Sequence, residues 1–193
     1  MKKLKADPRI GSRILEHPKQ KGTLYLLELI RKAPKVYLFG GGHISLHLVP
    51  LVKMVGFDLT LIDDRRKFAS PERFPQADEI HVMDFRNLSG EIKFEPESYV
   101  VIVTRGHLYD KQVLSQVLKN ETAYVGMIGS RRKRELIYRE LEKEGFARSR
   151  LARVHSPIGL DIGAETPEEI AVSIVAEMIS IRSGIQDHIL GNK

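Results

Sequence analysis

The sequence predicts a doubly wound α/β fold with a mostly parallel sheet. Short runs rich in β-branched and aromatic residues alternate with segments whose apolar residues recur at helical spacing. The first run, Val36 to Phe39, leads directly into three glycines, Gly40 to Gly42, and a helical pattern follows. The acidic pair Asp63-Asp64 ends the next run, about where dinucleotide-binding folds place a ribose-binding carboxylate. Together these observations predict a Rossmann-like domain of the NAD(P)-binding type.

The composition fits one soluble domain of this kind. Of the 193 residues, 42% are hydrophobic and 29% are charged. The lack of cysteine excludes disulfides and thiolate metal sites and fits a cytoplasmic location. No apolar run is long enough to cross a membrane, so we expect no membrane association. A net charge of +6 suggests an anionic partner, but the lack of tryptophan and of a basic, aromatic-rich helix argues against nucleic acid.

The chain is expected to have three parts. Residues 1–34 are predicted to be an N-terminal arm or the remnant of a preceding domain, residues 35–185 the Rossmann-like domain, and residues 186–193 a C-terminal tail. Arg9 to Glu16 could form a short helix, and the apolar stretch Thr23 to Ile30 suits a helix or a strand equally. Because an apolar edge at Thr23 to Ile30 can pair with a second copy, we expect a homodimer.

The first strand is predicted over Lys35 to Phe39, and the residues after it form the first candidate binding loop. Gly40 permits a tight turn, Gly42 lets a phosphate approach the backbone, and Ser45 takes the third position of G-x-G-x-x-G. The helix N-terminus that follows offers unpaired N–H groups to an anion. The candidate cofactor-binding residues in this loop are Gly40, Gly41, Gly42, His43 and Ser45.

The helix after this loop is predicted from apolar residues at helical spacing, from Ile44 to Val55. Gly56 is expected just beyond its C-terminus, and Pro50 is expected to kink it. The second strand, Phe57 to Ile62, ends in Asp63 and Asp64, candidates for binding a ribose. Arg65 follows, and it could read a 2′-phosphate or pair with the aspartates.

The remaining elements follow the same alternation. Strands are predicted over Glu79 to Met83, Tyr99 to Val103 and Ala123 to Ile128, with a short one over Leu151 to His155. Helices are predicted over Leu108 to Leu118, Glu135 to Glu144 and Pro167 to Ser183. Right-handed crossovers between parallel strands place the loops after the strands at one edge of the sheet. We therefore expect the candidate residues to line one rim.

Two of these loops add polar candidates to the rim. Thr104, Arg105 and His107 follow the fourth strand, where Rossmann enzymes contact substrate or nicotinamide; His107 is an acid–base candidate or an ordinary loop histidine. Ser130 is a predicted N-cap, and Arg131 and Arg132 lie in the first turn of its helix. The helix dipole disfavours positive charge there, and a bound phosphate would compensate for it.

The last candidate loop precedes the C-terminal helix. Gly159, Asp161 and Glu165 are candidate cofactor-binding residues, although Asp161 could equally satisfy loop amides in an Asx turn. Thr166, Pro167 and Glu169 predict a capping box that satisfies the helix start internally. The seven histidines show no spacing typical of a metal site, so none is predicted.

Four motifs, collinear over roughly Lys35 to Arg182, resemble the XdhC/CoxI family of xanthine dehydrogenase accessory proteins. They are Phe39-Gly-Gly-Gly-His-Ile-Ser45, Leu61-Ile-Asp-Asp-Arg65, Tyr124-Val-Gly-Met-Ile-Gly-Ser-Arg-Arg-Lys133 and Pro157-Ile-Gly-Leu-Asp-Ile-Gly-Ala-Glu-Thr-Pro-Glu-Glu-Ile-Ala171. The last two are the most specific. The resemblance implies the family's C-terminal Rossmann domain, which in longer members follows an N-terminal domain; only about 34 residues precede the glycines in this chain.

The resemblance also implies a function. It predicts a chaperone that binds molybdopterin or the molybdenum cofactor, assists its sulfuration by a cysteine desulfurase, and inserts it into a xanthine dehydrogenase-type molybdenum hydroxylase apoenzyme. Because the sequence shows no assembled acid–base constellation, we expect a non-catalytic accessory protein. The alternatives are an NAD(P)-dependent oxidoreductase, with His107 or His155 as proton donor, and a nucleotide-sensing interaction module.

Overall fold

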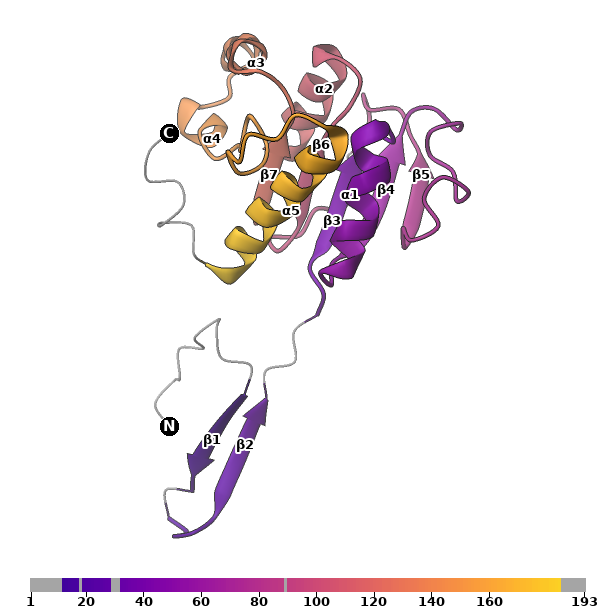
Figure 1. Ribbon diagram of the computed structural model, residues 1–193. Coiled ribbons are helices and arrows are strands. Elements are labelled where there is room, and N and C mark those ends of the chain that lie inside the picture. The colour runs from indigo at the N-terminus through magenta and orange to yellow at the C-terminus, as the bar shows by residue number, and fades with distance from the viewer. Residues whose placement is uncertain (1–11, 18, 29–31, 89, 185–193) are drawn as a thin grey trace.

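The computed structural model describes residues 12–17, 19–28, 32–88 and 90–184. Its first elements, β1 (Ser12–Glu16) and β2 (Leu24–Glu28), form an antiparallel hairpin in which Ile14 pairs with Leu26 (Figure 1). The short helix considered possible over Arg9 to Glu16 is therefore not present at residues 12–16, and residues 9–11 lie outside the described part. The stretch that suited helix or strand equally is a strand from Leu24 to Glu28.

A five-stranded parallel sheet forms the centre of the domain. Its strands run in the order β5-β4-β3-β6-β7. They are β3 (Lys35–Phe39), β4 (Asp58–Asp63), β5 (Glu79–Val82), β6 (Tyr99–Ile102) and β7 (Tyr124–Met127). Every residue of β6 and β7 is buried, as expected for strands that are covered on both faces. The predicted doubly wound, Rossmann-like fold is confirmed.

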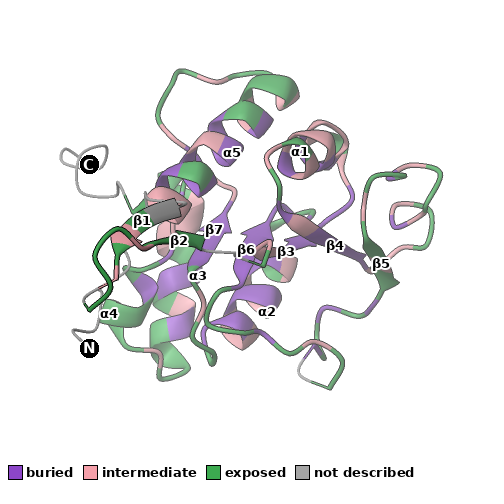
Figure 2. Cartoon of the chain, turned by 90° about the horizontal axis from the view of Figure 1, so that it is seen from below, coloured by how far each residue is buried: buried purple, intermediate pink, exposed green. Residues whose placement is uncertain are grey.

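Helices cover both faces of the sheet (Figure 2). One layer contains α1 (His43–Met54) and α5 (Pro167–Ser183), which pack over the core that includes Val36, Leu38 and Leu61. The other layer contains α2 (His107–Val117), α3 (Arg131–Lys143) and the short α4 (Arg148–Leu151), over the core that includes Phe39 and Ile102. Alternate residues of each central strand thus contribute to opposite cores.

The predicted helix ends are largely confirmed. The Ser130 side chain accepts from the Lys133 N–H, and Thr166 and Glu169 form the full capping box. Gly184 takes the left-handed conformation after α5, with φ of 70°. Helix α1 continues through Pro50 to Met54. No described helix is long and apolar enough to cross a membrane.

Two local predictions need correction. The strand over Leu151 to His155 is instead the end of α4 followed by a single parallel bridge between Gly126 and His155. Helix α3 begins at Arg131, as its predicted N-cap Ser130 requires, so the helical range predicted from Glu135 starts too late. Ile179 continues the apolar spacing of α5 but is 36% exposed.

Candidate functional site

The chain reverses its direction of travel across the sheet between β3 and β6, which are neighbours. In open α/β sheets, ligands bind in the crevice outside the carboxyl ends of the strands at such a point. The turn after β3 packs closely on the end of β6. A Cβ at Gly40 would lie 2.5 Å from the carbonyl oxygen of Val103, and Gly40 has a φ of 108°. Only glycine fits this position.

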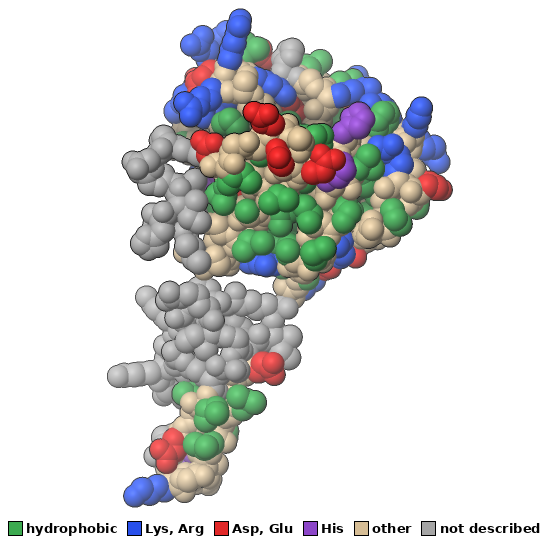
Figure 3. All heavy atoms as spheres, viewed as in Figure 1, with side chains coloured by type: hydrophobic (Ala, Val, Ile, Leu, Met, Phe, Trp, Pro, Cys, Tyr) green, Lys and Arg blue, Asp and Glu red, His purple; other side chains and the backbone are tan. Residues whose placement is uncertain are grey.

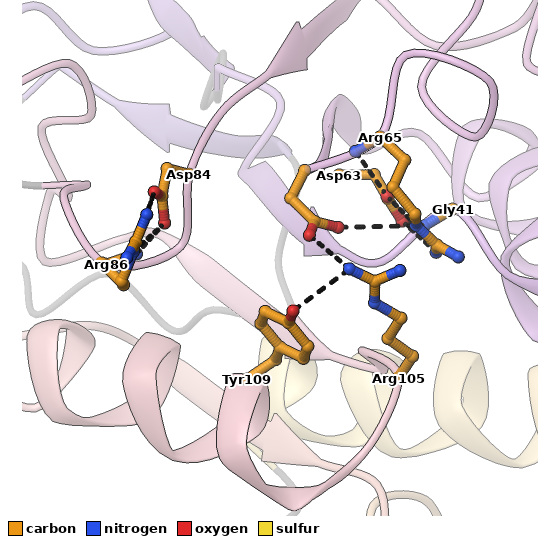
Figure 4. Close-up of polar contacts among 8 residues, drawn as sticks. Gly41, Asp63, Arg65, Asp84, Arg86, Arg105 and Tyr109 are labelled. Atoms are coloured by element: carbon orange, nitrogen blue, oxygen red, sulfur yellow. Dashed lines mark hydrogen bonds and ion pairs between the residues drawn. The ribbon is translucent and has the colours of Figure 1, made fainter.

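Asp63, at the end of β4, fastens the glycine turn. Its Oδ2 accepts from the Gly41 N–H at 2.8 Å, and its Oδ1 accepts from the Arg65 N–H at 3.0 Å and the Arg65 Nε at 2.9 Å (Figure 4). The residue is 1% exposed. Burial raises the pKa of Asp63, but hydrogen bonds from Arg65 and Gly41 outweigh burial, so the net pKa is lowered.

Two more predicted site residues also direct their polar atoms into the protein. The Ser45 hydroxyl donates to the Gly40 carbonyl oxygen, and Ser45 is fully buried. The Thr104 hydroxyl donates to the buried carboxylate of Asp110. Together with Asp63, these residues hold the loops around the crevice rather than presenting their polar atoms to it.

The N-terminus of α1 opens onto this crevice. Gly42 is its N-cap residue and makes no side-chain cap, and the first turn carries no acidic residue. A Cβ placed on Gly42 would meet no atom within 4 Å. His43, the first residue of the helix, is exposed. The first N–H groups of α1 are therefore available to an anion, and Gly42 leaves room for one.

Charged side chains border the crevice on the β4 and β6 sides. Arg105 Nη2 lies 2.7 Å from Asp64 Oδ2 and 3.2 Å from the Tyr109 hydroxyl (Figure 4). Asp64 Oδ1 has no hydrogen-bond partner among the described residues, although Arg65 Nε is 3.5 Å away. The Arg65 guanidinium lies over the Phe68 ring, 3.6 Å from its centroid. Of the two carboxylates in the acidic pair, that of Asp64 keeps an oxygen atom, Oδ1, that accepts no hydrogen bond from a described residue.

The exposed pair Asp84 and Arg86 follows β5 and was not predicted from the sequence. Arg86 Nε lies 2.9 Å from Asp84 Oδ2. Hydrogen bonds from Arg86 lower the pKa of Asp84 to about 2. In the view of Figure 4, the pair lies to the left of the other labelled residues. Nothing in its local sequence, an acidic and a basic residue around a phenylalanine, distinguishes it from an ordinary surface pair.

The other predicted rim residues belong to a second site, beside β7. A cavity of about 830 Å³ lies between the end of β7, the start of α3, the loop of residues 156–164 and α5. Ser130, Arg131, Gly159 and Asp161 line it, whereas Arg132 and Glu165 do not. The expected single rim is therefore divided between the crevice and this cavity. His107 begins α2, and its side chain lies outside the described part of the structure.

The basic start of α3 is largely neutralised by neighbouring helices and loops. Lys133 forms an ion pair with Asp110 of α2, and Arg134 contacts Glu135 and donates to the Ser156 carbonyl oxygen at 2.7 Å. At the acidic end, Lys111 of α2 lies 3.0 Å from Glu140. Among the described residues, Arg131 and Arg132 form no ion pair. Of the basic residues at this helix start, Arg131 and Arg132 therefore keep the positive charge that we expected a bound phosphate to compensate.

A buried carboxylate that was not predicted from the sequence lines the cavity. Glu177 of α5 is 2% exposed, and its Oε2 accepts from the Tyr124 hydroxyl at 2.6 Å and the Gly159 N–H at 2.8 Å. Its Oε1 lies 3.1 Å from His155 Nδ1. A signal existed in the sequence: Glu177 interrupts the apolar stripe of α5, between Val175 and Met178. A buried carboxylate needs partners, and these lie far away in the chain.

Among the residues that the structure describes, no three His, Cys, Asp or Glu side chains group closely enough to hold a metal ion. Lys and Arg side chains gather along the upper edge of the molecule, where the strands end (Figure 3). This positive charge favours anionic ligands at that edge.

Several known proteins are similar to this chain. It is 33% identical over 151 residues to the uncharacterized protein YqeB of Escherichia coli, in an alignment that covers 78% of this chain and 28% of YqeB. It is 30% identical to a probable xanthine dehydrogenase component of Bacillus subtilis, over 84% of this chain and 47% of that protein. It is 24% identical to the molybdenum cofactor insertion chaperone PaoD of Escherichia coli, over 53% of this chain and 32% of PaoD.

The crystal structure of a xanthine dehydrogenase from Bacillus halodurans superposes with a TM-score of 0.70 and 28% identity, over 88% of this chain and 47% of that one. The chain thus spans less than half the length of these relatives. Residues 36–178 match the family described as the XdhC Rossmann domain. The chain therefore belongs to the XdhC family and contains its Rossmann domain.

Proposed function

We propose that this protein is a molybdenum-cofactor-binding accessory protein that assists sulfuration of the cofactor and its insertion into a xanthine dehydrogenase-type molybdenum hydroxylase. Membership of the XdhC family supports this proposal, as does the similarity to PaoD, a molybdenum cofactor insertion chaperone. The cofactor is cargo in this proposal, an anionic pterin carrying a phosphate or a nucleotide.

The single observation that carries the proposal is the open N-terminus of α1 at the glycine turn. The cap position has no side-chain partner, and a Cβ placed on Gly42 would meet no atom within 4 Å. A phosphate there would accept from the first N–H groups of the helix and interact favourably with its dipole. At the border, Arg65 pairs with Asp63 and Arg105 with Asp64, and Asp64 Oδ1 offers an acceptor to a hydroxyl group.

The crevice is better suited to binding than to chemistry. Asp63, Ser45 and Thr104 are engaged in holding its loops. His43 is the one histidine with a described side chain among the residues predicted for the crevice, and no described carboxylate orients it. A positioned acid–base pair is what proton-transfer catalysis requires. We therefore propose an accessory role without catalysis.

Two neighbouring glycines give a direct test. Gly42→Ala should leave thermal stability unchanged, because its Cβ meets open space and its φ of −78° suits alanine, yet it should weaken molybdopterin binding at least tenfold by filling the phosphate position. Gly41→Ala should instead lower stability, because its Cβ would collide with the Phe68 carbonyl oxygen. Anaerobic calorimetry with molybdopterin and thermal denaturation measure both. Unchanged affinity in Gly42→Ala would refute the crevice as the phosphate site, and no molybdopterin binding by the wild type would refute the proposed function.

We propose the apoenzyme of a molybdenum hydroxylase and a cysteine desulfurase as partners, and a cytoplasmic location. Membership of the XdhC family and the similarity to a molybdenum cofactor insertion chaperone support a partner among the molybdenum hydroxylases. Co-purification of the tagged full-length protein with each candidate, with and without molybdopterin, tests this point. Loss of both interactions under both conditions would contradict the partner assignment.

An NAD(P)-dependent oxidoreductase is the second candidate, favoured by the glycine turn at the strand-order reversal. It predicts that NADH or NADPH binds with a change in nicotinamide fluorescence. Of the two carboxylates expected to bind the ribose, Asp63 already accepts from Gly41 and Arg65, so Asp64 would have to bind it. A lack of response to both nucleotides would eliminate it.

A further inference from the structure

The cavity beside β7 has the character of a small-molecule pocket. Its volume of about 830 Å³ lies within the range typical of ligand sites, about 300–1,000 Å³. Ile128, Ile158, Ile162 and Ile170 contribute apolar walls, and polar and charged side chains, Arg131 and Arg134 among them, line much of the rest. Apolar walls beside placed polar groups suit a flat ring that carries hydrogen-bonding groups at its edge.

Ser156 provides the first sign that a ligand belongs in this cavity. The residue lines the cavity and is 7% exposed, and its Oγ is buried without a hydrogen-bond partner among the described residues. Buried hydroxyl groups in folded proteins are nearly always paired, because an unpaired one loses its hydrogen bonds to water. A ligand in the cavity would supply the missing partner.

His155 provides the second sign. Burial raises the pKa of Glu177, but hydrogen bonds from His155 and Tyr124 outweigh burial and lower it overall, so Glu177 is a buried carboxylate. A carboxylate at 3.1 Å from Nδ1 fixes the N–H of the imidazole on that nitrogen. Nε2, the other nitrogen, makes no hydrogen bond to a described residue. His155 lines the cavity, with 15% of its side chain exposed.

Asp161 provides a third group, on the loop that borders the cavity. It is exposed, and it forms no hydrogen bond or ion pair with the described residues. A carboxylate matches the amino group and ring N–H of a 2-amino-4-oxopyrimidine, which present two adjacent donors. Polar groups at the floor, Ser156 and His155, match the oxygen and nitrogen atoms elsewhere on such a ring system.

We propose that this cavity binds the pterin ring of the cargo, with Ser156 Oγ and His155 as hydrogen-bonding partners at its floor and Asp161 as the acceptor for the amino-pyrimidine edge. The inference rests on the proposed function and divides its ligand between two sites: the glycine crevice takes the phosphate, and the cavity takes the ring. Both lie at the carboxyl edge of the sheet, after β3 and after β7.

The test uses pterin itself, 2-amino-4-oxopteridine, which is fluorescent and carries no phosphate. The protein contains no tryptophan, so its own emission interferes little. Titrating the full chain into pterin should raise the fluorescence anisotropy to saturation. Ser156→Ala should weaken pterin binding at least tenfold while keeping or raising the Tm, because the hydroxyl has no protein partner to lose. Asp161→Asn should weaken it by a similar factor without changing the Tm.

Matched controls isolate the cavity. Ser115→Ala, on α2 outside the cavity, and Gly42→Ala, in the crevice, should both keep pterin affinity within twofold of the wild type. Guanosine carries the same amino-pyrimidine edge, so it should compete with pterin but bind more weakly. Tighter binding of guanosine than of pterin would overturn the pterin assignment.

Two results separate this inference from the proposed function. If molybdopterin binds and Gly42→Ala abolishes binding, but pterin does not bind or Ser156→Ala has wild-type affinity, the cavity assignment is wrong and the accessory function stands. If pterin binds in the predicted manner and molybdopterin binding is insensitive to Gly42→Ala, the cavity assignment stands and the crevice assignment falls.

Discussion

At the scale of single residues, Asp63 shows how one carboxylate can organise a binding loop without touching a ligand. It joins the turn after β3 to the turn after β4 through the N–H groups of Gly41 and Arg65, and it neutralises the Arg65 guanidinium. Hydrogen bonds to a buried charge are worth more than neutral ones, about 1.5–3 kcal/mol each. The position of the anion-binding helix therefore depends on this side chain.

Asp63→Asn should destabilise the protein by about 2 kcal/mol at pH 7, because the amide keeps one acceptor but loses the charge. The folded pKa of Asp63 lies below its ordinary value of 3.8. The stabilisation is therefore fully present above about pH 4 and is lost as the pH falls through the folded pKa. Urea denaturation across pH 3–7 should show the difference between the two proteins shrinking at the acidic end.

Asp84→Asn is the matched control, because Asp84 also pairs with an arginine two residues later but is exposed. Exposed ion pairs contribute little to stability. This variant should unfold at the same urea concentration as the wild type at pH 7. Equal destabilisation by both substitutions would mean that the buried Asp63 network is not what holds the glycine turn.

At the scale of secondary-structure elements, charge is balanced between helices rather than within them. Helix α3 begins with basic residues and ends with acidic ones, against its own dipole. Asp110 and Lys111 of α2 pair with Lys133 at one end and with Glu140 and Glu144 at the other. Cross-helix ion pairs thus offset an arrangement that looks unfavourable in the isolated helix.

The start of α5 gives an element-scale prediction. Thr166→Ala removes the acceptor for the Glu169 N–H and should destabilise the protein by about 1 kcal/mol. Thr166→Ser, which keeps the hydroxyl, should restore wild-type stability. Thermal denaturation of the three proteins measures the effect. If the Thr166→Ala protein were as stable as the wild type, the cap would make no contribution to the free energy of unfolding.

Periodicity was sufficient to predict the domain's main strands and helices, because each buries an apolar stripe or run. It failed where tertiary contacts decide the structure. The strand expected near Leu151 is a helical turn, and Ile179 is exposed although it continues an apolar spacing. The segment around β1 is polar and basic, so its sequence does not indicate a strand. Strand β1 is defined by its pairing with β2.

The candidate site was predictable in location but not in detail. Parallel topology places every strand-to-helix loop at one edge, so the glycine turn, Asp63 and Ser130 all lie there. Spacing cannot show that Asp63 points inward or that the rim is divided in two. The pairing of His155 with Glu177 joins residues 22 positions apart, and only the packing of α5 against β7 brings them together.

At the scale of the whole molecule, the hairpin presents apolar side chains on both faces. Leu24 and Leu26 are 64% and 68% exposed on one face, and Tyr25 and Leu27 are about half exposed on the other. Two-stranded hairpins are marginally stable alone, and exposed apolar strands favour association.

We therefore expect a homodimer that forms through β1 and β2. Leu26→Lys should convert it to a monomer in light scattering coupled to size exclusion, because the charge would lie in the interface. The Tm of the Rossmann domain should stay the same. Val172→Lys, on the exposed face of α5, is the control and should remain dimeric. A wild-type monomer at high concentration would contradict the expectation.

The packing of α5 against α1 has a consequence for synthesis. Arg182, near the end of α5, donates to the Val55 carbonyl oxygen, 127 residues earlier, and its guanidinium lies over the Phe57 ring. While the ribosome is still adding residues after β7, the surface of α1 that α5 will cover is open to solvent. The nascent domain therefore cannot complete the core beneath α1 until α5 emerges, and that apolar surface stays open to non-native association until then.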